Sequence, residues 1–311
     1  MKTILPIALL FIQCLTTAET IEIMPDQKFQ NGFRIIDPKS QKVDHIEKTS
    51  PDGPEPSWRI AQWSTRFPFP DTMKRRELEN GAIIFEDETK SVEFHHEDGM
   101  IILGLDSITE YEGKFRDKTQ GWPHILVSQN FKTPFLSKFK NIKLSFEARI
   151  IDAENKEDPA EGYTPSLHAS QFQIFFIVQD AHPDSVGKNQ FYWHGVPLYD
   201  SRKPFHKESG HVDHNPDMPE AGRRYIYVPN SEDYNETGVS LQSGKWVKHE
   251  ADLLALIKQG LEKAKDAGAF PDSPVTLDHY KITHINIGWE MPGMAKARGA
   301  LRNFSVLGEL K

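Results

Sequence analysis

Two neighbouring segments of this sequence alternate apolar side chains with side chains that can hydrogen-bond to a sugar. The first is QFQIFFIVQD (residues 171–180), in which Gln173 stands opposite the apolar residues. The second is FYWHGVPLYD (residues 191–200), in which Tyr192 and His194 alternate with larger apolar rings. Because successive side chains of a strand point to opposite faces, each segment predicts a strand with one buried face and one face toward a ligand. Amide, phenol and imidazole groups on adjacent strands suit a sugar-binding cleft, so a polysaccharide or other glycan is the predicted partner.

Three further segments repeat this alternation and carry most of the remaining candidates. They are IKLSFEARI (residues 142–150), RYIYV (residues 224–228) and KITHINIGWE (residues 281–290). If their polar or aromatic faces belong to one sheet and point the same way, they assemble a single groove. The alternative is that some of these strands belong to the other sheet, whose polar face meets only water. The full candidate set is Glu147, Arg149, Gln173, Tyr192, His194, Tyr225, Tyr227, His284, Asn286 and Glu290.

The candidate set contains every group type that a polysaccharide lyase needs. Such an enzyme neutralises a uronate carboxylate, abstracts the C5 proton and protonates the leaving oxygen. Arg149 or Gln173 suits the first task, and His194, Tyr192 or Tyr225 suits the other two. Lyase chemistry with His194 or a tyrosine as the base is therefore one catalytic alternative.

Glycoside hydrolysis is the second catalytic alternative, and it needs two carboxylates. Their separation is about 5–5.5 Å for retention and about 6.5–9.5 Å for inversion. Glu147 and Glu290 are the best pair, because each alternates with core residues. The preferred function is nevertheless binding of a polysaccharide on a concave sheet, and a third class is an adhesion or scaffold role in the cell envelope. Residue types alone leave binding and catalysis both open.

Tryptophan stacks on sugar rings when it is exposed, but it more often packs in the interior. Trp58, Trp63 and Trp122 stand in loop-like or strand-edge contexts, where packing is the expectation and sugar stacking the alternative. Trp193 and Trp289 share the parity of the core residues in their segments, which predicts that both are buried.

The stretch from residue 206 to residue 217 is rich in histidine and aspartate. Histidine and carboxylate at such short spacings can bind zinc or copper, and aspartate oxygens can bind calcium. No spacing in the stretch matches an established metal signature, so we predict a solvated loop and no cofactor, with calcium as the alternative. The residues concerned are His206, His211, Asp213, His214 and Asp217.

The elements that must position these residues are short strands. About ten apolar runs separated by turn residues follow one another from residue 81 onward, which predicts a two-sheet sandwich. One segment, residues 253–270, instead has Leu253, Ile257 and Leu261 at helical spacing and Gly268 placed to end the helix. The predicted fold is all-β, a two-sheet antiparallel jelly-roll sandwich with one α-helix near the C-terminus.

The first eighteen residues have the pattern of a secretory signal peptide, with Lys2 before an apolar stretch and small residues at its end. We therefore expect residues 1–18 to be a signal peptide, 19–56 a polar N-terminal segment or edge strand, and 57–311 the jelly-roll domain. Cys14, the only cysteine of the 311 residues, lies in the signal peptide, so the mature chain has no disulfide. An exported chain without disulfides favours a bacterial source and a secreted or periplasmic location.

The formal net charge of −8 argues against nucleic acid and against anionic membrane surfaces, because both require a basic patch. No apolar run after the signal peptide is long enough to span a bilayer. We expect a monomer with no membrane span and no nucleic-acid partner.

The ending HINIGWEMPG…LRNFSVLG and the segment KWVKHEADLLALI resemble secreted β-jelly-roll glycan proteins, including galactose-binding-like modules and concanavalin-like polysaccharide lyases. The resemblance covers residues 81–310 and concerns layout. It implies a sandwich whose concave sheet meets a glycan.

Jelly-roll alginate lyases give a closer comparison, because this chain resembles them in its strands with Arg and Glu, with Gln, and with Tyr. FEARI supplies Glu147 and Arg149, and FQIF supplies Gln173. Phe175 stands at the position where that family has its neutralising histidine. The resemblance therefore implies a neutralising histidine in this chain only if His194 or His284 replaces the missing one.

Overall fold

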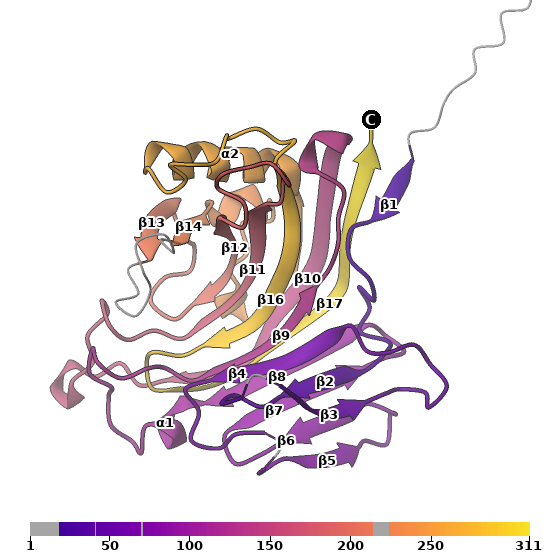
Figure 1. Cartoon of the computed structure of the whole chain (residues 1–311). Coiled ribbons are helices and arrows are strands. Elements are labelled where there is room, and N and C mark those ends of the chain that lie inside the picture. Colours follow the sequence, from indigo (N-terminus) through magenta and orange to yellow (C-terminus); the bar gives the residue numbers. More distant parts are fainter. Residues whose placement is uncertain (1–18, 41, 70, 214–223) are drawn as a thin grey trace, which may run out of the picture.

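The computed structural model describes residues 19–40, 42–69, 71–213 and 224–311. The signal peptide expected at residues 1–18 lies outside this part of the chain, as do His214 and Asp217. Two large sheets pack face to face, and a helix closes one end of the space between them (Figure 1). The predicted two-sheet jelly-roll sandwich with a helix near the C-terminus is confirmed.

The first sheet, called here the outer sheet, has the strand order β15-β10-β17-β8-β7-β6-β5, with β1 paired to β17. Its longest ladder joins β10 and β17, which run antiparallel over most of their length. Its strands are β1 (Thr20–Glu22), β5 (Lys74–Glu77), β6 (Ile83–Glu86), β7 (Lys90–His95), β8 (Met100–Asp106), β10 (Phe139–Asn155), β15 (Val247–Asp252) and β17 (Ala295–Leu310).

The second sheet, called here the groove sheet, has the strand order β13-β14-β12-β11-β16-β9-β4-β2-β3. Most of its ladders are antiparallel as predicted, but β12 pairs β14 and β2 pairs β4 in parallel. Its strands are β2 (Phe33–Ile36), β3 (Val43–Glu47), β4 (Trp58–Trp63), β9 (His124–Asn130), β11 (Gln171–Asp180), β12 (Phe191–Asp200), β13 (Ser209–Asp213), β14 (Arg224–Val228) and β16 (Tyr280–Glu290).

The predicted helix is α2 (Leu253–Asp266), and it begins and ends where its sequence dictates. Asp252 caps its first turn by accepting a hydrogen bond from the Ala255 amide, and Gly268 follows its end with a φ of +67°. Its apolar face is buried against β10, β12 and β14, at the end of the sandwich. The remaining helical segments are short: α1 (Ser107–Glu110) and the 3₁₀ turns η1 (Leu136–Lys138), η2 (Pro159–Glu161), η4 (Ser231–Asp233) and η5 (Leu241–Ser243).

One hydrophobic core fills the space between the two sheets. Alternate residues of β10 and β11, such as Leu144, Phe146, Ile174 and Phe176, point into it and are almost fully buried. This core leaves the opposite face of the groove sheet free of covering elements over its middle strands. Among the described residues, no helix is both long and apolar enough to cross a bilayer.

Candidate functional site

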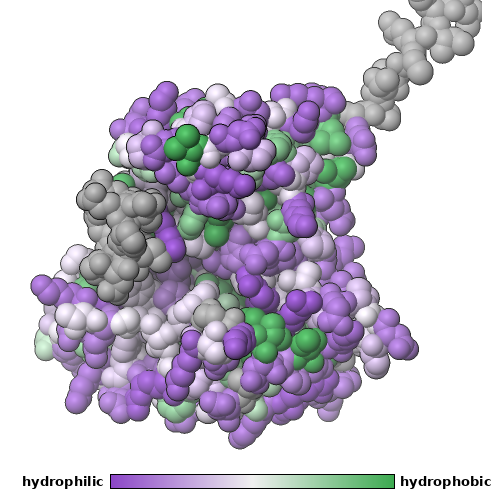
Figure 2. Space-filling view, in the orientation of Figure 1, coloured by the Kyte–Doolittle hydropathy of each residue, from purple (hydrophilic) through white to green (hydrophobic). Residues whose placement is uncertain are grey.

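A groove of about 670 Å³ runs over the exposed face of the groove sheet. Its floor comes from β4, β9, β16, β11 and β12, and one wall comes from β13, β14 and the segment around residues 202–206. The surface is hollowed between the block that carries α2 and the block that carries β2 to β6 (Figure 2). The site is therefore built on five rigid strands, and its walls come from the chain segments at their ends.

Strand pairing sets which side chains lie beside one another on the groove floor. Glu290 is paired across the sheet with Gln171 on one side and with His124 on the other. Gln171 is in turn paired with Asp200, and His124 with Trp63. Because directly paired residues point to the same face, these five side chains form one row across the groove. We call it the carboxylate row.

Aromatic rings line the groove on both sides of this row. Trp63 and Trp122 flank His124, with ring centroids 5.7 Å from the imidazole in each case. Trp193 lies edge-on to Phe175, with centroids 5.9 Å apart, in the neighbouring strands β12 and β11. All four rings of Trp63, Trp122, Phe175 and Trp193 line the groove and are partly exposed. Flat, partly exposed rings beside amides and charges form a surface that suits the apolar face of a sugar.

Glu290 and His124 lie side by side at the centre of the carboxylate row. Nδ1 of His124 lies 2.7 Å from the Trp122 carbonyl oxygen, and it carries a proton because a carbonyl only accepts. Nε2 of His124 faces Oε2 of Glu290 at 3.5 Å. The side chains of His124 and Glu290 are only 16% and 23% exposed, so the pair is largely shielded from solvent.

Two effects compete in setting the pKa of Glu290. Burial disfavours its ionised form, but the imidazole of His124 and polar contacts from Trp122 and Gln173 outweigh burial and hold the pKa below its usual range. Glu290 is thus an ionised carboxylate beside an imidazole, which is an arrangement that acid–base chemistry uses.

Asp200 is the other carboxylate of the groove, and a neighbouring guanidinium neutralises it. Arg202 donates to it from Nε at 2.8 Å and from Nη2 at 2.6 Å, and Gln171 donates from Nε2 at 3.1 Å. Burial raises the pKa of Asp200, but the hydrogen bonds from Arg202 prevail and lower it. Asp200 and Glu290 stand two strands apart, a spacing of about 10 Å between the outer strand axes.

The far end of the floor is built from amides, an imidazole and an arginine. His284 contacts Asn286 through Nε2 at 2.8 Å and contacts Asn130 through Nδ1. Burial, helped by the charge of Arg59, lowers the pKa of His284 to about 4, so this imidazole is neutral near pH 7. Between Asn286 and Glu290, Gly288 has a φ of +151°, and a Cβ there would lie 2.2 Å from the Ile125 carbonyl oxygen, so the close approach to β9 requires a glycine.

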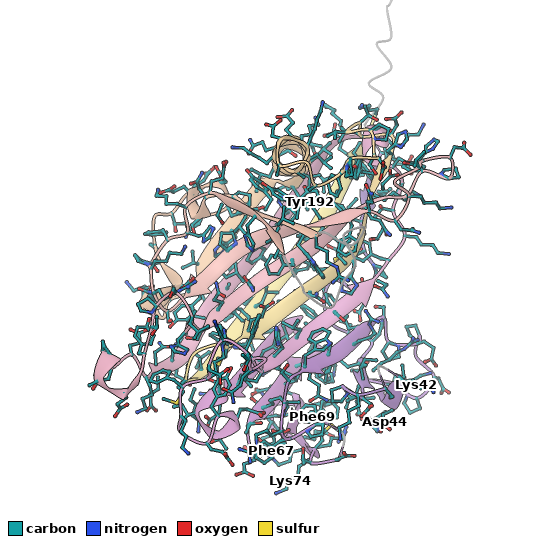
Figure 3. The ribbon with its side chains drawn as sticks, turned by 60° about the vertical axis from the view of Figure 1, so that its left-hand side comes forward. Lys42, Asp44, Phe67, Phe69, Lys74 and Tyr192 are labelled. Atoms are coloured by element: carbon teal, nitrogen blue, oxygen red, sulfur yellow. The ribbon has the colours of Figure 1, made fainter. Side chains whose placement is uncertain are left out.

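The structure brings four of the predicted site residues together in this groove: Gln173, His284, Asn286 and Glu290. It places Tyr192, His194, Tyr225 and Tyr227 on the opposite face of the sheet, where each is at most 5% exposed. The expectation that these four share the groove is wrong, because β12 and β14 turn their tyrosines inward beneath α2. Tyr192 lies beneath this helix and far from the lower strands (Figure 3).

Tyr192, His194 and Tyr234 form a chain of hydrogen bonds in the interior. Tyr234 and His194 Nε2 are 2.8 Å apart, His194 Nδ1 and Tyr192 are 3.3 Å apart, and Tyr192 donates to the Ile257 carbonyl at 2.9 Å. Burial lowers the pKa of His194 to about 3 and raises the pKa of Tyr192. Because every polar atom has a partner and no solvent reaches them, these groups hold α2 on the sheet and cannot meet a polysaccharide.

Glu147 and Arg149 lie on the other sheet, on β10, and the expectation that they join the groove is wrong. Glu147 accepts a hydrogen bond from Arg302 Nε at 2.6 Å and another from Asn303 at 3.1 Å, both on β17. Arg149 Nε is buried and has no hydrogen-bond partner. The predicted carboxylate pair of Glu147 and Glu290 is therefore divided between the two sheets.

The segment expected to form a solvated loop is partly a strand. His206 and His211 line the groove wall, and His206 Nε2 lies 2.9 Å from Ser209 Oγ. Burial, with Lys203 nearby, lowers the pKa of His206 to about 4. Across residues 19–40, 42–69, 71–213 and 224–311, no three His, Cys, Asp or Glu side chains are grouped to hold a metal.

Sequence reasoning missed several groove residues. Trp193 was assigned to packing, but it lines the groove, whereas Trp289 is fully buried as predicted. For Trp63 and Trp122 packing was the expectation and sugar stacking the alternative, and both line the groove. Trp58 is buried, as expected. Arg59 and His124 were not identified. Arg59 stands between the buried Trp58 and Ile60, which marks its side chain as facing away from the core, but β9 is buried from Ile125 to Gln129, so no alternation marks His124.

Comparison with known proteins gives structural neighbours only. No family model matches this chain, and no curated protein sequence matches it. A thermo-stable cellulase derived from the Cel12A cellulase of Rhodothermus marinus is similar with 13% identity and a TM-score of 0.40, over 75% of this chain and 95% of that one.

A metagenome-derived glycoside hydrolase family 12 endoglucanase is similar with 11% identity and a TM-score of 0.41, over 78% of this chain and 96% of that one. The family 11 xylanase from Neocallimastix patriciarum has 8% identity and a TM-score of 0.32, over 77% of this chain and 93% of that one. At these values the likenesses do not bear on what this chain binds.

Proposed function

We propose that this protein binds a polysaccharide in the groove of the groove sheet. The observation that carries the proposal is the line of partly exposed rings, Trp63, Trp122, Phe175 and Trp193, set among amide and charged groups on one open face. On a buried sheet face these rings would be fully covered, and a sheet face that contacts only solvent would not have a cluster of large aromatic side chains. A sugar chain offers the apolar ring faces and hydroxyls that this surface matches.

Binding is tested by retention of the mature protein on a panel of polysaccharides in affinity gels, with the best ligand then titrated in solution. Trp193→Ala and Trp63→Ala should each weaken binding about tenfold or more, in line with the loss of a central aromatic contact. Trp246→Ala is the matched control, because Trp246 is partly exposed on the outer sheet side and stacks with Arg302 at 4.1 Å, outside the groove. Equal losses in all three variants would contradict a groove-specific site.

Catalysis at Glu290 is a second candidate function, favoured by the contact of this carboxylate with the His124 imidazole at 3.5 Å. A hydrolase would use Glu290 with Asp200, and their two-strand separation of about 10 Å lies nearer the inverting range than the retaining one. A lyase would use His124 or His284 as the base, because His194 and Tyr192 are inaccessible in the core. Both alternatives place the chemistry in the carboxylate row or beside it.

The two chemistries are separated by their products. New reducing ends without ultraviolet absorbance indicate a hydrolase, and an absorbing unsaturated product indicates a lyase. Glu290→Gln should abolish turnover while leaving binding within about threefold, because the amide keeps the size of the side chain and loses only the charge and the ability to take up a proton. Glu250→Gln, on the outer sheet, is the control. Binding with no product from any polymer would leave the protein a binding module.

We propose further that this function is exercised outside the cytoplasm. The support is the signal-peptide pattern of residues 1–18. Amino-terminal sequencing of protein recovered from the periplasm or medium should start near residue 19. Protein that retains Met1 and stays in the cytosol would contradict this placement.

A further inference from the structure

The groove carries a positive charge that the protein does not neutralise. Arg59 lines the groove from β4, in the row that also contains Ser128 and Asn286. No carboxylate lies within ion-pair distance of Arg59 among residues 19–40, 42–69, 71–213 and 224–311, and its guanidinium makes no hydrogen bond to them. A half-buried guanidinium normally has such partners, because its burial is otherwise unfavourable.

A second arginine stands directly beside the first. Arg34 on β2 is the cross-strand partner of Arg59, so both side chains point to the same face. Among the described residues, Arg34 has one ion-pair partner, Glu55 at 3.8 Å, and Lys48 already binds Glu55 at 2.6 Å. The Nε of Arg34 is buried and has no hydrogen-bond partner. The Glu55 carboxylate is thus shared by Arg34 and Lys48, and none of the described carboxylates balances the charge of Arg59.

The surroundings of Arg59 bear the effects of that charge. Burial lowers the pKa of Arg59, and the neighbouring Arg34 lowers it further. The same positive field contributes to the low pKa of His284, which therefore adds no charge of its own near pH 7. At the other end of the groove, Arg202 neutralises Asp200. Lys203 and Arg224 line the wall and form no ion pair with the described residues, so the groove is positive there as well, and Arg59 is the cation of its floor.

Arg59 and the carboxylate row are separated along the strands. Trp63, in the carboxylate row, is four residues from Arg59 on β4, which corresponds to about 13 Å of strand. A sugar ring bound at Glu290 would therefore not reach Arg59, and a different unit of the same chain would meet it. The two ends of the groove then recognise different parts of one polymer.

We infer that Arg59, with Arg34 beside it, forms an anion subsite that selects polysaccharides bearing carboxylate or sulfate groups. This inference rests on the proposed binding of a polysaccharide in the groove. A planar guanidinium pairs with both oxyanions through two parallel hydrogen bonds, and Ser128 and Asn286 supply further donors in the same row. The neutral His284 keeps the subsite from acquiring a third cation.

The test compares each charged polymer with derivatives that lack one of its anionic groups, on the mature wild-type protein. Chondroitin sulfate, desulfated chondroitin, carboxyl-reduced chondroitin sulfate, polygalacturonate and carboxyl-reduced polygalacturonate are titrated at two salt concentrations. The charged form of at least one pair should bind about tenfold or more tightly than its derivative, with the preference reduced by salt. Loss of the preference on desulfation identifies sulfate as the ligand, and loss on carboxyl reduction identifies carboxylate.

Arg59→Gln should remove this preference and leave affinity for the uncharged carboxyl-reduced polygalacturonate within about twofold, because the amide keeps hydrogen-bonding capacity without charge. Arg76→Gln is the matched control, since Arg76 pairs with Glu86 on the outer sheet, away from the groove. Equal binding of charged and neutral forms, or a preference that survives Arg59→Gln, overturns the inference while polysaccharide binding stands. Failure of a folded wild-type protein to bind any polymer overturns the proposed function and this inference together.

Discussion

Tyr192 and Trp193 are consecutive residues of β12 that point to opposite faces, and they should separate stability from binding. Tyr192 is fully buried and donates to the Ile257 carbonyl at 2.9 Å, while Trp193 is partly exposed in the groove. Tyr192→Phe keeps the ring and removes the hydroxyl. It leaves the Ile257 carbonyl without this donor and His194 Nδ1 without an acceptor, both in the core.

The expected cost of Tyr192→Phe is about 1–3 kcal/mol of unfolding free energy, because a buried polar group is left without its partner. The lower end applies if the Ile257 carbonyl keeps a good bond within α2, where it also accepts from the helix backbone. Affinity for the polysaccharide should stay within about twofold, since no atom of Tyr192 reaches the groove. Trp193→Ala should instead lower affinity about tenfold or more through the lost stacking contact.

Urea unfolding followed by far-ultraviolet circular dichroism gives the stability of both variants, and titration with the best polysaccharide gives their affinities. Circular dichroism is preferred because removing a tryptophan changes the fluorescence signal itself. The reversed pattern, in which Tyr192→Phe loses binding and Trp193→Ala keeps it, would refute the assignment of faces on β12. It would return Tyr192 to the ligand surface.

Two further predictions concern buried charges outside the groove. Lys90→Met should destabilise the protein by about 3–5 kcal/mol, because Lys90 is fully buried between Asp87 at 2.7 Å and Glu110 at 3.6 Å and its loss leaves both carboxylates uncompensated. The control is Lys207→Met, which removes one partner of an exposed ion pair with Glu232 and should cause no measurable change in stability. Equal losses of stability in urea unfolding of the two variants would contradict the reasoning. Stability should also fall as pH drops, because the pKa of His194 is about 3 in the folded protein and about 6.5 when unfolded, so the unfolded state binds more protons in between. His194 alone predicts a loss of about 2 kcal/mol between pH 6.5 and pH 5, and a His194→Gln variant with an unchanged pH slope would count against this cause.

The architecture was predictable because period-two patterning reports burial directly. Leu144 and Phe146 in β10 and Ile174 and Phe176 in β11 alternate with polar residues, and each pair lies in the core as expected. The helix was equally clear, since Asp252 and Gly268 mark both of its ends. Local signals of this kind need no knowledge of which strands are neighbours.

The site was predictable only where the polar face of a strand was also the open face. For β16 and β11 this held, so Gln173 and Asn286 were found. For β12 the interior is capped by α2 and contains a hydrogen-bonded network, so its inward residues are Tyr192 and His194, and Trp193 is left outside. The polar residues of β12 therefore predict the wrong face, because a buried network of hydrogen-bonded side chains has the same sequence pattern as a ligand-binding surface.

Sheet membership was the other missing information. Glu147 has the same alternation as Glu290, but β10 pairs with β15 and β17 in the outer sheet and never reaches the groove. Pairing between strands far apart in the chain is set by the whole fold, and no local pattern in IKLSFEARI indicates it. The same reason hid Arg59 and His124, which become groove residues only through the neighbours of β4 and β9.

The most direct test of the account is a crystal structure of the protein with an oligosaccharide of the best-binding polymer. The account predicts sugar rings lying against Trp193, Trp122 or Trp63 on the groove sheet, with one unit beside Glu290. Ordered sugar on the outer sheet, or on any other surface with the groove empty, would contradict it.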